Sequence, residues 1–155
     1  MRVNLTDEEL FICRTLGVMR RSVAMKNVKD QQVGNDCVWS IDIDGVVAEY
    51  CVAKMLNVCV DLSVSPRNGG HDLVSKGKTI DVKSTRHKNG RLLATLKKKD
   101  SPCDVYILAI VDDGGADVVG WEYGESLFDD KNRIDLGHGV GYGIQQDKLR
   151  KFDKR

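Results

Sequence analysis

One segment constrains the fold more than any other: residues 104–111, DVYILAIV, form an almost continuous apolar run. A run of this length is typical of a strand at the centre of a sheet, covered on both faces. A turn at 112–115 follows it, and ADVVGWEY at 116–123 then predicts a second strand. Because helical patterns flank these strands, we expect an α/β fold with a mixed central β-sheet and helices packed on it.

The N-terminal part of the chain carries helical signals. Thr6 and Glu9 form a capping box, which predicts a helix that begins directly after Thr6. We expect Gly17 to interrupt this helix and a second helical stretch to run over 18–29. Residues 30–43 are polar and are predicted to form a loop.

The clearest helix is predicted over 44–57, DGVVAEYCVAKMLN, with Asp44 as its N-cap. A short helix is expected within 122–129. After the glycine-rich stretch 137–143, the segment QQDKLRKF at 145–152 is predicted to form a closing helix.

Residues 71–85, HDLVSKGKTIDVKST, alternate in polarity and predict a β-hairpin, with a third strand over 91–96. If the turn is centred on residues 76–77, Asp72 lies opposite Asp81. Carboxylates in such a pair, with Cβ atoms about 4.5–5.5 Å apart, destabilise the ladder. A bound divalent cation would remove that penalty.

The periodicities of strand and helix predict that further side chains lie near Asp72 and Asp81. Lys83 lies on the face of Asp81, whereas Ile80 and Val82 point to the opposite, apolar face. On the predicted helix 44–57, Glu49 has small or apolar neighbours and should face the sheet. A buried carboxylate needs a partner, and a metal or a lysine is the natural one.

These residue types suit phosphodiester hydrolysis, which needs an activated water and stabilised charge in the transition state. We expect Asp72 and Asp81, together with Glu49 and the backbone carbonyl of Val82, to hold Mg²⁺, with Mn²⁺ as a substitute. Lys83 is expected to orient or deprotonate the water, or to stabilise the developing charge.

Charge is unevenly distributed although the formal net charge is only +1. Residues 76–99 hold nine basic side chains and one acid, whereas residues 100–130 hold nine acids and no lysine or arginine. Such a basic block suits a polyanion, most often nucleic acid, and the alternative is a solvated charged loop. The residues expected to contact DNA are Ser84, Arg86, Lys88, Arg91, Lys97, Lys98 and Lys99. Weaker candidates are His71, which is expected near the metal site, and Trp39 and the stretch 137–143, which are expected near the DNA.

Asp72, eight intervening residues and then Asp81-Val82-Lys83 resemble the signature of the PD-(D/E)xK nuclease superfamily. The upstream helix with Glu49 resembles the first core helix of that family, so the likeness covers about residues 44–122. It implies a restriction-endonuclease-like core in α-β-β-β-α-β order and catalytic roles for Glu49, Asp72, Asp81 and Lys83. The motif's proline is absent here, because His71 precedes Asp72.

These observations predict a metal-dependent deoxyribonuclease, most readily an endonuclease. The alternatives are a Holliday-junction resolvase or an exonuclease of the same fold, and, from another class, a catalytically silent DNA-binding module. A homodimer would let so small a nuclease cut two strands. We expect one domain, with N-terminal helices (1–43), a catalytic core (44–122) and a C-terminal strand and helix (123–155).

Composition excludes several other classes. No run of eighteen apolar residues is present, so we expect no membrane span, and the acidic N-terminus does not resemble a secretory signal. The five cysteines lack a CxxC spacing, which predicts reduced, buried thiols and a cytoplasmic protein, with a phage or mobile element as a suitable setting.

Overall fold

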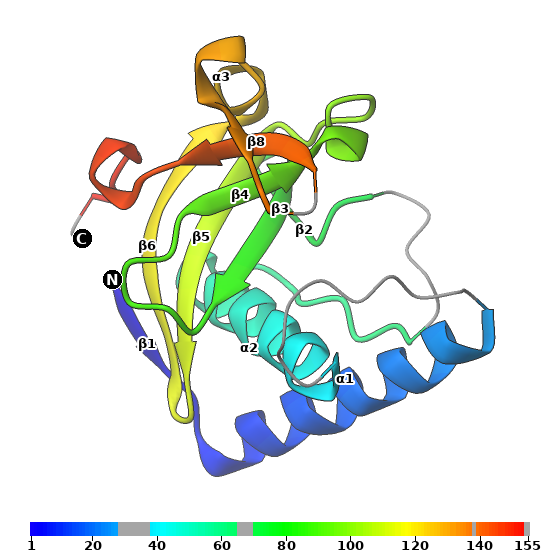
Figure 1. Cartoon of the computed structure of the whole chain (residues 1–155). Helices are drawn as coiled ribbons and strands as arrows, with labels where there is room; N and C mark the ends of the chain where they lie inside the picture. The colour runs from blue at the N-terminus through cyan, green and yellow to red at the C-terminus, as the bar shows by residue number, and fades with distance from the viewer. Residues whose placement is uncertain (28–37, 65–69, 138, 154–155) are drawn as a thin grey trace.

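The central apolar segment forms β5 (Val105–Asp112), the middle strand of a five-stranded sheet. The computed structural model describes residues 1–27, 38–64, 70–137 and 139–153 (Figure 1). The sheet order is β1-β6-β5-β3-β2, and only the β3–β5 pair is parallel. The other strands of this sheet are β1 (Arg2–Asn4), β2 (Leu73–Ser75), β3 (Lys78–Thr85) and β6 (Gly115–Tyr123).

Alternate side chains of β5 face two different layers. Ile107 and Ala109 belong to the apolar cluster beneath α1 (Asp7–Asn27) and α2 (Val38–Leu56). Tyr106 and Leu108 belong to a second cluster, beneath a small sheet. That sheet has the order β4-β8-β7, from β4 (Leu92–Thr95), β8 (Val140–Ile144) and β7 (Arg133–Asp135). Figure 1 shows α2 against the main sheet, α1 outside α2, and β4 and β8 on the other side. The predicted α/β class, mixed sheet and packed helices are therefore confirmed.

The predicted break at Gly17 is wrong, because α1 runs unbroken through this residue. A Cβ atom at position 17 would lie only 2.8 Å from the Cα of Ile43 on α2. The absence of a side chain at Gly17 thus allows α1 and α2 to approach closely, and α1 continues through this residue. Burial against α2 outweighs the low helix propensity of glycine.

The N-terminal end of α2 also differs from the prediction. Residues 38–43 are helical, so the expected loop is wrong over them, while 30–37 lie outside the described residues. Asp44 is inside the helix and is not its N-cap. Its carboxylate instead accepts hydrogen bonds from Arg86 at 2.7 and 2.8 Å, a partner far away in the sequence.

The predicted closing helix is wrong as well. The segment forms only a 3₁₀ turn at Gln146–Lys148, after which Arg150 and Trp121 exchange backbone hydrogen bonds of 2.9 and 3.0 Å. Pairing with β6 and burial of Leu149 therefore prevail over local helix propensity. The expected short helix is confirmed as α3 (Gly124–Leu127), and the expected third strand as β4.

Between β4 and β5, a stretch that is fully described, the chain forms only the 3₁₀ helix η1 (Leu96–Lys98). The α-β-β-β-α-β pattern would have an α-helix after its third strand. The restriction-endonuclease-like core is therefore not confirmed. Within the described ranges, no helix is both long enough and apolar enough to cross a bilayer.

Candidate functional site

The hairpin register predicted from the sequence is confirmed for its three ladder pairs. Leu73 pairs with Ile80, Val74 with Thr79, and Ser75 with Lys78. The two turn residues, Lys76 and Gly77, have φ angles of 50° and 75°. Positive φ at both central residues is what the type I′ turn of a two-residue hairpin requires. The turn therefore fixes the register that brings Asp72 toward β3.

Asp72 lies directly before β2 and is tied to β3 on either side of Asp81. Its backbone N–H donates to the carbonyl of Ile80 at 2.8 Å, and its Oδ2 accepts a 2.7 Å hydrogen bond from the N–H of Val82. Ile80 and Val82 themselves point into the helix-side core, as predicted. The Asp72 carboxylate is thus held beside the strand that carries Asp81.

Asp81 is the most deeply buried charged residue among those described, with 2% of its surface exposed. Lys83 Nζ lies 2.6 Å from its Oδ1, and Lys98 Nζ lies 2.5 Å from its Oδ2. Asp81 pairs in register with Tyr106, so it faces the small-sheet side, opposite α1 and α2. Removing a carboxylate from water is costly, and two ammonium groups offset that cost here.

Lys98 comes from η1 and also donates to the carbonyl of Gly70 at 2.8 Å. Burial lowers the pKa of Lys98, but the hydrogen bond and charge of Asp81 outweigh burial and leave the pKa above its ordinary value. Burial also raises the pKa of the neighbouring Cys103 thiol, and Asp81 raises it further. Lys98 is therefore held as a cation, and Cys103 as a neutral thiol.

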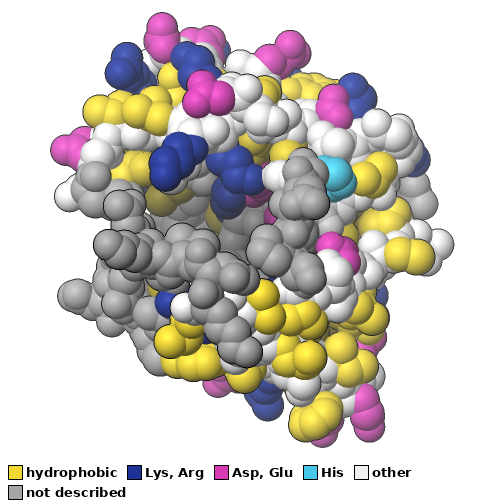
Figure 2. All heavy atoms as spheres, turned by 90° about the vertical axis from the view of Figure 1, so that its right-hand side faces the viewer, with side chains coloured by type: hydrophobic (Ala, Val, Ile, Leu, Met, Phe, Trp, Pro, Cys, Tyr) yellow, Lys and Arg dark blue, Asp and Glu magenta, His cyan; other side chains and the backbone are white. Residues whose placement is uncertain are grey.

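A cleft of about 350 Å³ opens beside this cluster. Figure 2 shows the hollowed face, with lysine and arginine side chains near the hollow. The residues that line the cleft come from both helices, from the segment before β2 and from η1: Arg20, Ile41, Asp42, Gly45, Glu49, Gly70, His71, Asp72 and Lys98. The cleft therefore brings Glu49, Asp72 and Lys98 together, and Lys98 joins it to Asp81.

Glu49 is buried, as its helical neighbours predicted, but its partner is Arg20. Arg20 Nη1 lies 2.9 Å from Glu49 Oε2, and the same guanidinium donates to the carbonyls of Asp61 and Ser63. Arg20 is not among the residues expected at the site from the sequence. The helical spacing does indicate its position: Arg20 follows the buried Leu16 by four residues and so lies on the inner face of α1.

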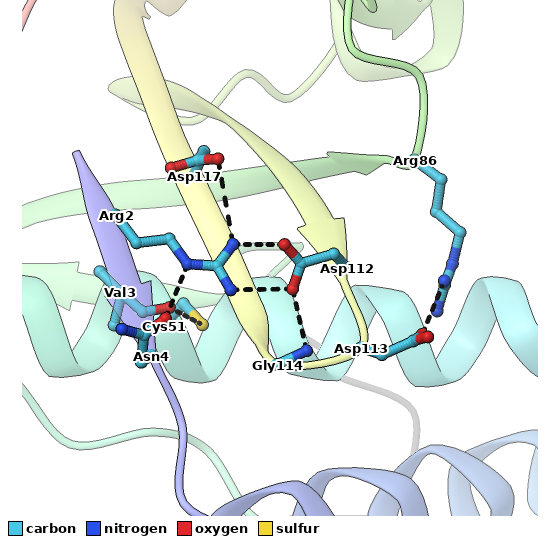
Figure 3. Close-up of polar contacts among 9 residues, drawn as sticks. All are labelled: Arg2, Val3, Asn4, Cys51, Arg86, Asp112, Asp113, Gly114 and Asp117. Carbon is cyan, nitrogen blue, oxygen red and sulfur yellow. Dashed lines mark hydrogen bonds and ion pairs between the residues drawn. The ribbon is translucent and has the colours of Figure 1, made fainter.

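The basic block 76–99 does not form one continuous surface. Ser84 pairs with Ala109 and faces the helix side, away from Asp81. Arg86 binds Asp44 and Asp113, the latter at 3.0 Å (Figure 3). Lys88, Arg91 and Lys97 are exposed, and Lys99 donates to the Tyr142 hydroxyl at 2.8 Å.

The weaker sequence candidates lie in different places. His71 lines the cleft, next to Asp72. Trp39 lies in the first turn of α2 and is 39% exposed. The glycine-rich stretch mostly forms the β7–β8 hairpin, with residue 138 outside the described residues.

The side chains around Asp81 offer a small set of donors for a divalent cation. Asp72 and Asp81 offer hard carboxylate oxygens, and Asp81 Oδ1 accepts no well-oriented hydrogen bond despite the nearby Lys83. Two carboxylates suffice for Mg²⁺, which keeps several of its waters. No group of three or more His, Cys, Asp or Glu side chains is poised for a metal in the described part of the chain. The residues therefore fit a site with few protein ligands.

Searches against protein-family models, curated proteins and solved structures found no match for this chain.

Proposed function

We propose that this protein is a metal-dependent nuclease that hydrolyses DNA phosphodiester bonds, acting as an endonuclease. The observation that carries the proposal is Asp81, a buried carboxylate with an ammonium group at each oxygen. An apolar side chain of similar volume at this position would serve stability as well or better. A charged cluster kept next to an open cleft suggests a chemical role.

Asp72 and Asp81 are the residues that would hold Mg²⁺ or Mn²⁺, with the Val82 carbonyl and Glu49, which also lines the cleft, as further ligands. When bound, the cation would supply a water of lowered pKa and would stabilise charge on the phosphate. Asp72 is well suited to hold a ligand in place, because the Val82 N–H fixes its carboxylate.

The lysines supply positive charge where the phosphate would gain negative charge. Lys83 reaches Asp81 from the same strand, and Lys98 reaches it from η1. Preorganised cations of this kind stabilise a transition state without reorganising during the reaction. Among the residues that the structure describes, a Cβ atom at Gly45 would meet nothing within 4 Å, so no described side chain fills the cleft above this part of α2. A phosphate group that entered there would displace none of the described side chains.

DNA is proposed as the substrate because several lysines and arginines of the basic block are exposed, one of them beside Lys98, which lines the cleft. Lys97 is next to Lys98, and Lys88 and Arg91 follow the end of β3. Contacts of this kind to the DNA backbone depend on charge and carry no sequence preference. A homodimer remains part of the proposal only as a way to cut two strands.

The test is cleavage of a covalently closed, supercoiled plasmid with and without Mg²⁺. We expect nicking that requires Mg²⁺ and that is lost in Asp72→Asn, an isosteric change that still accepts from Val82. Asp117→Asn is the matched control, since Asp117 is an exposed aspartate on β6.

Other outcomes separate the alternatives. Cleavage of linear DNA alone would indicate an exonuclease, and selective cutting of four-way junctions a resolvase. DNA binding without cleavage under any divalent cation would contradict the proposal and indicate a silent binding module.

A further inference from the structure

The two lysines on Asp81 are not equivalent. Lys83 lies two residues away on the same strand, so its position follows from β3 itself. Lys98 comes from another element and spans two acceptors, Asp81 Oδ2 at 2.5 Å and the Gly70 carbonyl at 2.8 Å. Lys98 also lines the cleft that contains Asp72 and Glu49. Its ammonium therefore lies between the cleft and the buried carboxylate.

This position conflicts with a simple role in contacting DNA. A cation that enters from the cleft and binds Asp81 would meet the Lys98 ammonium at the same oxygen. Like charges at such separations repel strongly in a partly buried site. Either Lys98 moves when a metal binds, or the metal does not reach Asp81.

We propose that Lys98 is the exchangeable cation of this site: it occupies Asp81 Oδ2 in the metal-free protein and leaves that oxygen when a divalent cation binds. The inference rests on the proposed metal-dependent function. Lys98 can move because its side chain is one-third exposed and its terminal bonds rotate freely. Once released, its ammonium faces the cleft, where a phosphate oxygen of DNA is its natural acceptor.

The proposal separates Lys98 from its neighbours on η1. Lys97 is exposed, and Lys99 binds the Tyr142 hydroxyl. Neither has a contact to Asp81 in the described structure, so neither should compete with a metal there. Lys98→Met removes the charge and keeps the length of the side chain, and Lys97→Met is the matched control.

The first experiment measures Mn²⁺ binding without DNA, by calorimetry, in the wild type and both variants. We expect Lys98→Met to bind Mn²⁺ roughly tenfold more tightly than the wild type, because a competing cation is gone. Lys97→Met should keep the wild-type affinity. Equal or weaker binding by Lys98→Met would overturn the proposal, and so would the absence of Mn²⁺ binding in every protein.

A second experiment uses the wild-type protein and therefore does not depend on the folding of Lys98→Met. The ¹⁵N-detected ammonium signals of wild-type lysines are followed by NMR during a Mg²⁺ titration, with Lys98→Arg used to assign the Lys98 signal. We expect the Lys98 signal to shift or broaden as the site fills, and a constant signal at saturating Mg²⁺ would overturn the proposal. Failure of the proposed function would look different: Mn²⁺ affinity would rise in Lys98→Met although the metal-loaded wild type cuts no DNA.

Discussion

Two ion-pair clusters of this protein, each made of aspartate and basic side chains, lie in opposite surroundings. In the first, Asp81 is buried, meets two lysines and lies next to a cleft. In the second, Arg2 of β1 binds Asp112 and lies near Asp117, at the turn between β5 and β6 (Figure 3). The carboxylate side chains of that second cluster are 56% and 55% exposed.

The comparison shows which cluster the fold can explain. Arg2 fastens the first strand to the β5–β6 turn, and exposed pairs of this kind contribute about 1 kcal/mol or less. This small contribution to stability is sufficient to explain the surface cluster. The cluster around Asp81 is buried, and replacing a buried ion pair of this kind by apolar side chains is often neutral or stabilising, so stability is weak grounds for keeping it. A role in chemistry is therefore proposed only for the buried cluster.

The largest effect is expected for Asp81→Asn. Cleavage should fall by at least about 10²-fold, because metal binding and the charge of the site are lost together. The variant should also lose roughly 1–3 kcal/mol of unfolding free energy, since two partly buried ammonium groups lose their acceptor. Single-turnover cleavage and urea unfolding measure these two effects. Wild-type cleavage by this variant would reduce the Asp81 cluster to a structural ion pair.

Lys83→Met is expected to have the next largest effect. The rate of the chemical step should fall about 10²-fold, because Lys83 acts on charge that develops in the transition state. DNA affinity measured in Ca²⁺ should stay near the wild-type value, since the ground state changes little. A large loss of DNA affinity with an unchanged rate would instead make Lys83 a binding residue.

A smaller effect is expected for the double variant Lys97→Ala and Lys99→Ala, which leaves Lys98 in place. DNA affinity should fall alike for all sequences, and the salt dependence should lessen by about one counterion for each lost phosphate contact. Fluorescence anisotropy at several salt concentrations measures both. An unchanged salt dependence would remove these two lysines from the DNA interface.

The smallest effect is expected at the surface cluster, for Asp112→Asn. The hydrogen bond from Arg2 lowers the pKa of Asp112, so the pair stabilises the fold above the ordinary pKa of an aspartate. That contribution is lost as the pH falls through the lowered pKa of the folded state. The variant should therefore be less stable by about 1 kcal/mol or less at pH 7 and equal to the wild type in acid. Urea unfolding at both pH values tests this, and a difference that persists in acid would assign the effect to another cause.

The sequence predicted the parts of the site that depend on local rules. Strand alternation and a two-residue turn were enough to predict the hairpin register and the position of Lys83 next to Asp81. Asp72 contacts β3 through Ile80 and Val82, the two neighbours of Asp81. The apolar run predicted the central strand β5. In each case, the residues that fix the structure lie within a few positions of one another.

The parts that could not be predicted depend on contacts between distant segments. Lys98 reaches Asp81 because η1 folds back beside the hairpin, and composition distinguished Lys98 from neither Lys97 nor Lys99. From the sequence alone, Gly17 is expected to break the helix, because its contact with Ile43 exists only in the folded structure. Strand alternation thus predicted one lysine beside Asp81, whereas the tertiary fold decides that a second lysine, Lys98, also meets this carboxylate.

The most direct test of the account is a crystal structure of the protein soaked in Mn²⁺, with the metal located by anomalous scattering. The account predicts a peak bound by Asp72 and Asp81, with oxygen ligands at about the 2.0–2.2 Å typical of such hard cations. In the same map, Lys98 should have left Asp81 Oδ2. A fully soaked crystal with no peak at these carboxylates, and with both lysines still on Asp81, would contradict the central claim.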